Sequence, residues 1–152
     1  MSSGFVHLHT HSSYSPMWGI PTLEALCQAA RTQGQDKLAL TDTNGLYGAI
    51  RFLEVAKHEG LKPILGAELV HKAHRAVLLA KTPAGYANLC RLLSARHEES
   101  TFDFIAAVAR YRAGLIILSD DLSALRTWRK DSPKDVYVEL TPGSDIQKAR
   151  TL

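Results

Sequence analysis

Short apolar runs alternate with amphipathic segments along nearly the whole chain, and this alternation limits the folds open to it. Runs with the length and composition of strands lie at residues 5–9, 37–41, 62–65, 76–80, 115–118 and 136–140. Apolar residues at helical spacing occupy segments between and after them, at 22–33, 46–58, from 83 onward, 100–111, 122–128 and 144–151. Because strands that alternate with helices form βαβ units, we expect an α/β fold with mostly parallel strands.

The strand candidates are nearly continuous apolar runs, such as Leu-Ile-Ile-Leu at 115–118. Strands of this kind are buried on both faces of a sheet, which fits either an open doubly wound sheet or a barrel. A complete eightfold barrel takes about 250 residues, and the chain has 152, so any barrel here is incomplete. In the helix expected at 46–58, Leu46, Ile50 and Leu53 share one face, which we expect to pack inward.

Composition excludes several classes of protein. The net charge of +3 is too small to argue for nucleic-acid binding by itself. The two cysteines, Cys27 and Cys90, fall inside helical patterns without Cys-x-x-Cys spacing, which predicts buried free thiols in a reducing compartment. The N-terminus lacks the pattern of a signal peptide, and no apolar run approaches the ~20 residues of a membrane span. We therefore expect a cytoplasmic protein without membrane contact.

Histidine or carboxylate side chains follow several of the predicted strands. His9 and His11 come at the end of the first, Asp42 follows the second, Glu68 the third and Asp120 the fifth. Because functional groups in α/β folds gather at the carboxyl ends of the strands, these side chains are expected at one rim. Their arrangement favours a shared site over independent surface positions.

The chemistry of these residues favours a metal. Side chains alternate along a strand, so His7, His9 and His11 are expected on one face. Imidazole and carboxylate ligands together suit Zn, Mn or Fe, and a bridging carboxylate can hold two or more ions for phosphoryl transfer. The alternative is a polar rim of hydrogen-bonded histidines, but His-x-His with Asp and Glu at three strand ends favours a metal origin.

Three segments, in order, resemble the PHP (polymerase and histidinol phosphatase) superfamily. They are His-Leu-His-Thr-His-Ser-Ser-Tyr-Ser at 7–15, Leu-Ala-Leu-Thr-Asp at 38–42 and Lys-Pro-Ile-Leu-Gly-Ala-Glu-Leu at 62–69. Two further segments, at 44–52 and 78–94, are similar to the N-terminal part of bacterial DNA polymerase III α subunits. The resemblance implies a (βα)7 barrel, here incomplete, and a single PHP domain over 1–152 that is truncated at its C-terminal end.

The resemblance also implies a metal cluster at the barrel rim. His9 and His11 would be the first ligand pair, Asp42 would belong to the second motif, and Glu68 would be a bridging carboxylate. Zn or Mn is the expected metal, with Mg or Fe as alternatives. Four residues are secondary candidates, three for metal and the last for phosphate or substrate: His7, His74, Asp120 and Arg75.

The chain departs from the family pattern at several of these positions. Thr43 stands where the family has a histidine after Thr-Asp, and Met17-Trp18-Gly19 replaces Leu-Asp-Gly. Arg75 aligns with an expected histidine, while His74 lies one place away, and no late Asp-x-His motif occurs in the 152 residues. The expected site is therefore only partly kept.

Two functions follow from the resemblance, and both stay open. The first is a PHP module of a polymerase III α subunit, replicative or error-prone, acting in bacterial DNA replication or repair synthesis. It would have a degenerate metal site and a structural or partner-docking role, with DNA reached through the polymerase and a proofreading exonuclease subunit as a partner. The second is an active metal-dependent phosphoesterase or 3′–5′ proofreading exonuclease.

Two further expectations concern alternatives and assembly. An amidohydrolase-like enzyme would need a metal-bridging lysine on a middle strand, but Lys37 and Lys62 stand at strand starts, which is the wrong end. An incomplete barrel would leave sheet edges exposed, and such edges favour self-association. We therefore expect either a homodimer or a chain of marginal stability.

Overall fold

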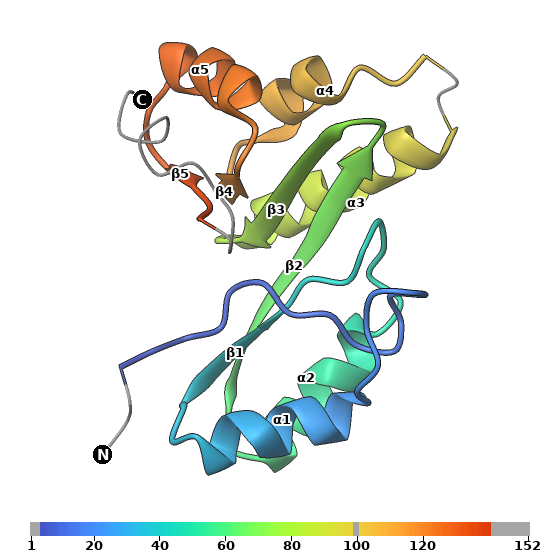
Figure 1. Ribbon diagram of the computed structural model, residues 1–152, viewed down its shortest axis with the longest axis vertical. Helices are drawn as coiled ribbons and strands as arrows, with labels where there is room; N and C mark the ends of the chain where they lie inside the picture. The colour runs from blue at the N-terminus through green and yellow to red at the C-terminus, as the bar shows by residue number, and fades with distance from the viewer. Residues whose placement is uncertain (1–3, 99–100, 141–152) are drawn as a thin grey trace. The chain divides into compact units, whose positions relative to one another are not determined.

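The structure is a computed structural model that describes residues 4–98 and 101–140, and its chain forms two compact units, Met1–Glu68 and Leu69–Leu152 (Figure 1). The first unit holds α1 (Leu23–Thr32), β1 (Lys37–Leu40), α2 (Ala49–His58) and most of β2 (Lys62–His71). The second holds the end of β2, then β3 (His74–Ala80), α3 (Pro83–Glu98), α4 (Phe104–Tyr111), β4 (Leu115–Ser119), α5 (Leu122–Asp131) and β5 (Val136–Val138).

The strands follow one another in the sheet in chain order, from β1 to β5. β1 pairs with β2 and β4 with β5 in parallel, whereas β3 runs antiparallel to β4. Only two residues, with Lys72 at φ 53°, separate β2 from β3, so the chain reverses there without room for a crossover helix. The α/β class with mostly parallel pairing is confirmed, and within the described residues the sheet is not closed.

The strand expected at 5–9 is wrong in detail, because this segment forms no regular strand and bends at His9. It is nevertheless bonded to β1 and its continuation: Ala39 N donates to the carbonyl of His7, and Thr41 N donates to that of Thr10, each at 3.0 Å. Thr10 N donates instead to the Thr41 hydroxyl, at 2.8 Å. The Thr41 side chain thus accepts a hydrogen bond that a backbone carbonyl would accept in a regular sheet. This interrupts the strand, but the segment stays hydrogen-bonded to β1.

The core of the first unit packs α1 and α2 against β1 and the strand β2. Its buried members from α1 are Leu23, Cys27 and Ala30, and those from β1 and α2 are Leu38, Leu40, Phe52, Val55 and Ala56. Leu61, directly before β2, is also buried in it, and Leu65 of β2 packs against it. The inward face expected for α2 is wrong, because Ile50 and Leu53 are exposed by 67% and 37%. The helix begins only at Ala49, so Leu46 precedes it, and the row with Phe52 faces the core instead.

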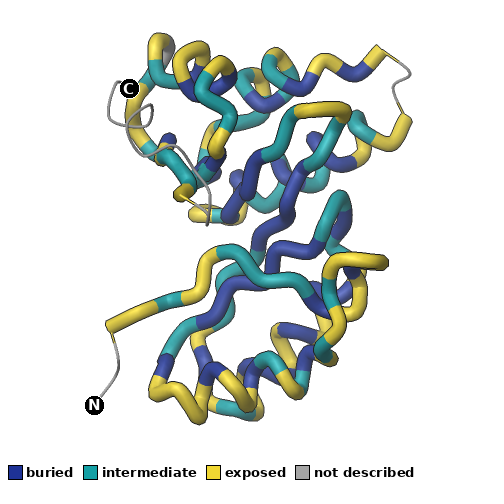
Figure 2. Tube along the Cα trace, in the orientation of Figure 1, coloured by how far each residue is buried: buried dark blue, intermediate teal, exposed yellow. Residues whose placement is uncertain are grey.

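The second unit has its own core, visible as the buried stretches of β3, β4 and the helices in Figure 2. Leu78, Leu89, Ile117 and Trp128 are fully buried, and Trp128 Nε1 donates to the carbonyl of Ile105 at 3.0 Å. The helix expected at 144–151 lies outside the described residues. Within the described ranges, no helix combines the length and apolarity needed to cross a membrane.

Candidate metal centre

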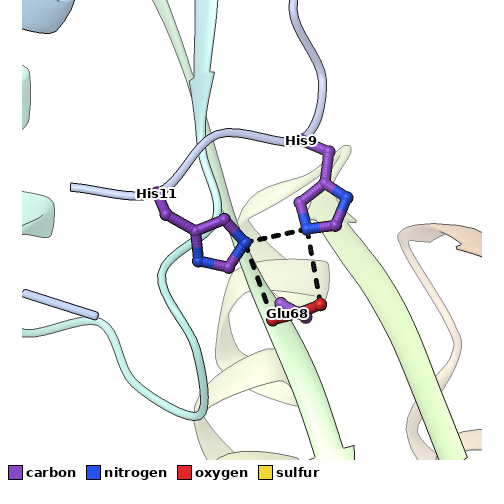
Figure 3. Close-up of side chains that lie close together, drawn as sticks. All are labelled: His9, His11 and Glu68. Atoms are coloured by element: carbon purple, nitrogen blue, oxygen red, sulfur yellow. Dashed lines mark hydrogen bonds and ion pairs between the residues drawn. The ribbon is translucent and has the colours of Figure 1, made fainter. Parts of the chain in front are cut away.

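Three side chains of ligand type meet in the first unit: His9, His11 and Glu68 (Figure 3). His9 Nε2 lies 2.9 Å from His11 Nε2 and 3.4 Å from Glu68 Oε1, and His11 Nε2 lies 3.6 Å from Glu68 Oε2. Glu68 is buried, with 4% of its surface exposed. We call these three residues the triad.

Backbone pairing brings the triad together from distant parts of the chain. His9 and His11 lie two residues apart on the segment that is bonded to β1. Glu68 lies on β2, where Glu68 N donates to the carbonyls of Thr41 and Asp42, at 3.3 and 3.1 Å. The residues directly after β1 therefore connect the histidine segment to the strand that carries the carboxylate.

The donor set and its spacing fit one divalent ion. Ligand atoms arranged tetrahedrally around Zn²⁺ at about 2.0–2.1 Å are separated by about 3.3 Å. In the triad the two imidazole nitrogens lie 2.9 Å apart, and each lies 3.4 or 3.6 Å from a different oxygen of the Glu68 carboxylate. Two imidazole nitrogens with a carboxylate oxygen suit Zn, Mn and Fe. The triad could thus hold a metal with small adjustments of its side chains.

The electrostatics of Glu68 also favour cation binding. Burial raises the pKa of this carboxyl, but hydrogen bonds from His9 and Thr43 and the charge of the neighbouring imidazoles outweigh it, so the pKa is lowered. The carboxylate is therefore ionised at neutral pH, which is the form that ligates a metal.

Asp42, which was expected as a ligand, lies outside the triad and anchors the loop after His11. Its Oδ1 accepts hydrogen bonds from Ser12 N at 2.7 Å and Ser15 Oγ at 2.6 Å, and its Oδ2 accepts one from Ser12 Oγ at 2.8 Å. All three residues are buried. A carboxylate with three donors is well satisfied without a metal, so direct ligation by Asp42 stays a prediction.

The loop that carries these serines folds tightly back on itself. Ser15 N donates to the carbonyl of Ser12, and Trp18 N and Gly19 N both donate to that of Ser15. A Cβ at Gly19 would lie 1.9 Å from the carbonyl oxygen of Ser12, so only glycine fits there. This close turn holds the hydroxyls of Ser12 and Ser15 where both donate to the Asp42 carboxylate.

Thr43 takes part in the site, which the sequence alone did not indicate. Its hydroxyl donates to Glu68 Oε2 at 2.9 Å and lies 3.2 Å from His11 Nδ1. Sequence comparison marked this position only as a missing ligand. The available signal was its place directly after Thr41-Asp42, where the family pattern was expected to have a histidine.

The secondary candidates have other partners. His7 is exposed and packs edge-on against Phe5, with ring centroids 4.8 Å apart. In the second unit, Arg75 Nη2 pairs with Asp120 Oδ2 at 2.8 Å and with Glu139 Oε2 at 3.3 Å.

His74 belongs to another pair of the second unit. Its Nδ1 lies 2.5 Å from Asp121 Oδ2, and its ring stacks on Phe104 with centroids 5.4 Å apart. The metal and phosphate roles expected of His7, His74, Asp120 and Arg75 therefore stay predictions.

Comparison with known sequences identifies the family. The PHP domain profile matches residues 7–140. An error-prone DNA polymerase of Symbiobacterium thermophilum is 47% identical over 94 residues, which cover 61% of this chain and 9% of that protein. The DNA polymerase III subunit alpha of Treponema pallidum is 35% identical over 140 residues, covering 78% of this chain and 12% of that protein. This chain spans about a tenth of the length of these relatives.

Solved structures share the fold. One, from Bifidobacterium adolescentis, is described as a metal-dependent phosphoesterase and matches with a TM-score of 0.62 and 12% identity, over 99% of this chain and 84% of that one. A two-domain protein of Bacteroides vulgatus, described as containing a PHP-like metal-dependent phosphoesterase, matches with a TM-score of 0.55 and 14% identity, over 91% and 39%. Because the PHP profile covers most of the sequence, the chain belongs to the PHP domain family.

Proposed function

We propose that this chain is the PHP part of a DNA polymerase III α-type protein, replicative or error-prone, and that it keeps one divalent-metal site with a mainly structural role. The observation that carries this is the triad of His9, His11 and Glu68, whose ligand atoms all lie within 4.8 Å of one another. Similarity to polymerase subunits supports the setting in DNA replication or repair synthesis.

In this proposal the two imidazole nitrogens and the Glu68 carboxylate hold the ion. Zn or Mn fits the donor set best, and such an ion supplies charge neutralisation and Lewis acidity toward a phosphate oxygen. The chain's own contribution is to bring three ligands from two distant segments to one point. An ion held there would tie the histidine segment to β2 and stabilise the fold by mass action.

The test is metal content and binding in the full chain. We expect about one equivalent of Zn or Mn per chain by plasma mass spectrometry, raising the melting temperature on addition to metal-free protein. His9→Ala should abolish both effects. His58→Ala, which removes an exposed histidine outside the triad, is the matched control. Failure of the wild-type chain to bind either metal would refute the proposal.

The second candidate is an active phosphoesterase or 3′–5′ exonuclease, and one feature of the triad supports it. Three protein ligands with a further position for water or substrate are typical of catalytic zinc sites. The opposing feature is Thr43, which stands where the family has a histidine, so ligands for a fuller cluster are missing. The test is hydrolysis of p-nitrophenyl phosphate or removal of 3′ nucleotides from single-stranded DNA. Activity in the wild-type chain that is lost in His9→Ala would favour this catalytic function over the structural role.

Partner docking forms the rest of the proposal. A polymerase setting implies DNA as a partner through the parent protein, a proofreading exonuclease subunit as a docking partner, and a cytoplasmic location. One loop supports docking, because Met17, Trp18 and Ile20 are exposed by 102%, 74% and 92%. Trp18→Ser should weaken binding of the purified exonuclease subunit to the parent polymerase, whereas Ser13→Ala should not.

The expected homodimer is part of the same proposal and rests on a sheet that is not closed over the residues the structure describes. Light scattering of the full chain should give twice the monomer mass. A monomer at all concentrations would refute the dimer and would leave the proposed metal site unaffected.

A further inference from the structure

The side of the His11 ring that faces away from the triad meets two hydroxyl groups. His11 Nδ1 lies 3.2 Å from Ser15 Oγ and 3.2 Å from Thr43 Oγ1. Its other nitrogen, Nε2, points at His9 and Glu68 (Figure 3). A neutral imidazole carries its proton on one of these nitrogens, and its neighbours decide which.

Each hydroxyl has a single proton, and both protons are already used. Ser15 Oγ donates to Asp42 Oδ1 at 2.6 Å, and Thr43 Oγ1 donates to Glu68 Oε2 at 2.9 Å. The carboxylates cannot return a proton, because an ionised carboxylate only accepts hydrogen bonds. Toward His11, both oxygens therefore present lone pairs.

Two acceptors facing one ring nitrogen require that nitrogen to be the donor. We infer that Ser15 and Thr43 are positioning residues that hold neutral His11 with its proton on Nδ1 and present the Nε2 lone pair to the metal. This rests on the proposed metal site. Metal-ligating histidines commonly donate their second N–H in this way, which fixes the ring and raises ligand basicity.

The network gives Thr43 a use that differs from the histidine found elsewhere in the family. Its hydroxyl donates to the carboxylate and accepts from the imidazole, so one side chain orients two members of the triad. Ser15 links the same imidazole to buried Asp42 and also accepts from Thr43 N at 3.0 Å. Asp42 thus acts on His11 through Ser15.

The first experiment reads the tautomer directly on the metal-free full chain. Long-range ¹H–¹⁵N NMR, at a pH where the ring is neutral, should show His11 protonated on Nδ1. Protonation on Nε2 would overturn the inference whether or not the chain binds metal. A chain with the Nδ1 tautomer but no metal affinity would refute the proposed function and leave the positioning inference standing.

The second experiment measures Zn²⁺ affinity by chelator competition. Loss of partners that hold metal ligands typically costs about 10–100-fold in affinity, and we expect Thr43→Val to lose affinity in that range and to populate the Nε2 tautomer. Thr43→Ser keeps the hydroxyl and should restore both readouts. Ser13→Ala removes an exposed hydroxyl outside the network and is the control for a serine change.

Ser15→Ala is the third variant. We expect it to lose Zn²⁺ affinity and to shift the His11 ring toward the Nε2 tautomer. Because this change also removes a donor from buried Asp42, its melting curve must show that the chain folds. If it does not fold, the Thr43→Val and Thr43→Ser pair decides. Wild-type affinity with an unchanged Nδ1 tautomer in Thr43→Val would overturn the role given to Thr43.

Discussion

The two units carry the same kinds of polar residue and use them differently. In the first unit, His9, His11 and Glu68 turn their ligand atoms toward one point, with two imidazoles facing one buried carboxylate. In the second unit, Arg75 pairs with Asp120, and His74 pairs with Asp121. The presence of histidines and acids near strand ends is therefore not sufficient for a metal site, because separate pairs can satisfy each charge without a metal ion.

The largest effect expected from this comparison concerns metal affinity. Glu68→Gln keeps the size of the side chain but removes the anionic ligand, and should lower Zn²⁺ or Mn²⁺ affinity by more than about 100-fold, beyond the loss typical of supporting residues. Asp121→Asn, in the second unit, should leave affinity unchanged. Calorimetric titration measures both, and an equal loss in the two variants would show that the second unit contributes to the site.

The next effect concerns stability. Asp42→Ala leaves three buried donors, from Ser12 and Ser15, without their acceptor. We expect a loss of about 2–4 kcal/mol of unfolding free energy, given the cost of unsatisfied buried groups. Asp120→Ala breaks a partly exposed ion pair with Arg75 and should cost about 0–1 kcal/mol. Urea denaturation measures both losses of unfolding free energy. Similar losses in the two variants would contradict the difference between the units.

A smaller effect concerns pH. Burial raises the pKa of Asp121, but hydrogen bonds from His74, Ser123 and Ala124 outweigh it and lower the pKa overall. A carboxyl with a lowered folded-state pKa stabilises the fold above its unfolded pKa of about 3.9 and loses that contribution as pH falls through the folded value.

Asp121→Asn should therefore be less stable than wild type at pH 7, and the difference should shrink as the pH falls below about 4. Asparagine still caps the helix α5, so the variant isolates the charge. Melting temperatures across this range measure it, and a difference that grew on acidification would have the wrong sign.

The smallest effect separates the two cysteines, one in each unit. Burial raises the pKa of Cys27 to about 11, with a further contribution from Glu59 and Glu24, so its thiol stays neutral and shielded. Cys90 is only partly buried, against the expectation that both would be buried. At pH 8 a thiol reagent should label Cys90 first and Cys27 only on unfolding. Equal rates in the native protein would show that the first unit opens readily.

Several features of the fold could be read from local pattern. The helices α1 and α5 and the strands β1, β3 and β4 lie close to their expected positions, because their apolar spacing and capping residues, such as Thr22 and Asp121, act within a few residues. The predictions for the inward face of α2 and for the segment at 5–9 were wrong, because each depends on residues distant in the sequence. In α2 the side of the helix with Phe52 packs into the core. At Thr10 the backbone N–H donates to the Thr41 side chain in place of a sheet hydrogen bond.

The sequence by itself determined the family and the candidate ligand pair, since His9 and His11 are two residues apart and an extended backbone turns alternate side chains to one side. Tertiary structure decided which carboxylate joins them. Asp42 follows β1 and Glu68 lies on β2, but Asp42 is enclosed by the hydroxyl and amide donors of Ser12 and Ser15, 27 to 30 residues away, while Glu68 faces the imidazoles. A buried carboxylate is held by whichever donors the fold brings to it, and that pairing is invisible in the local sequence.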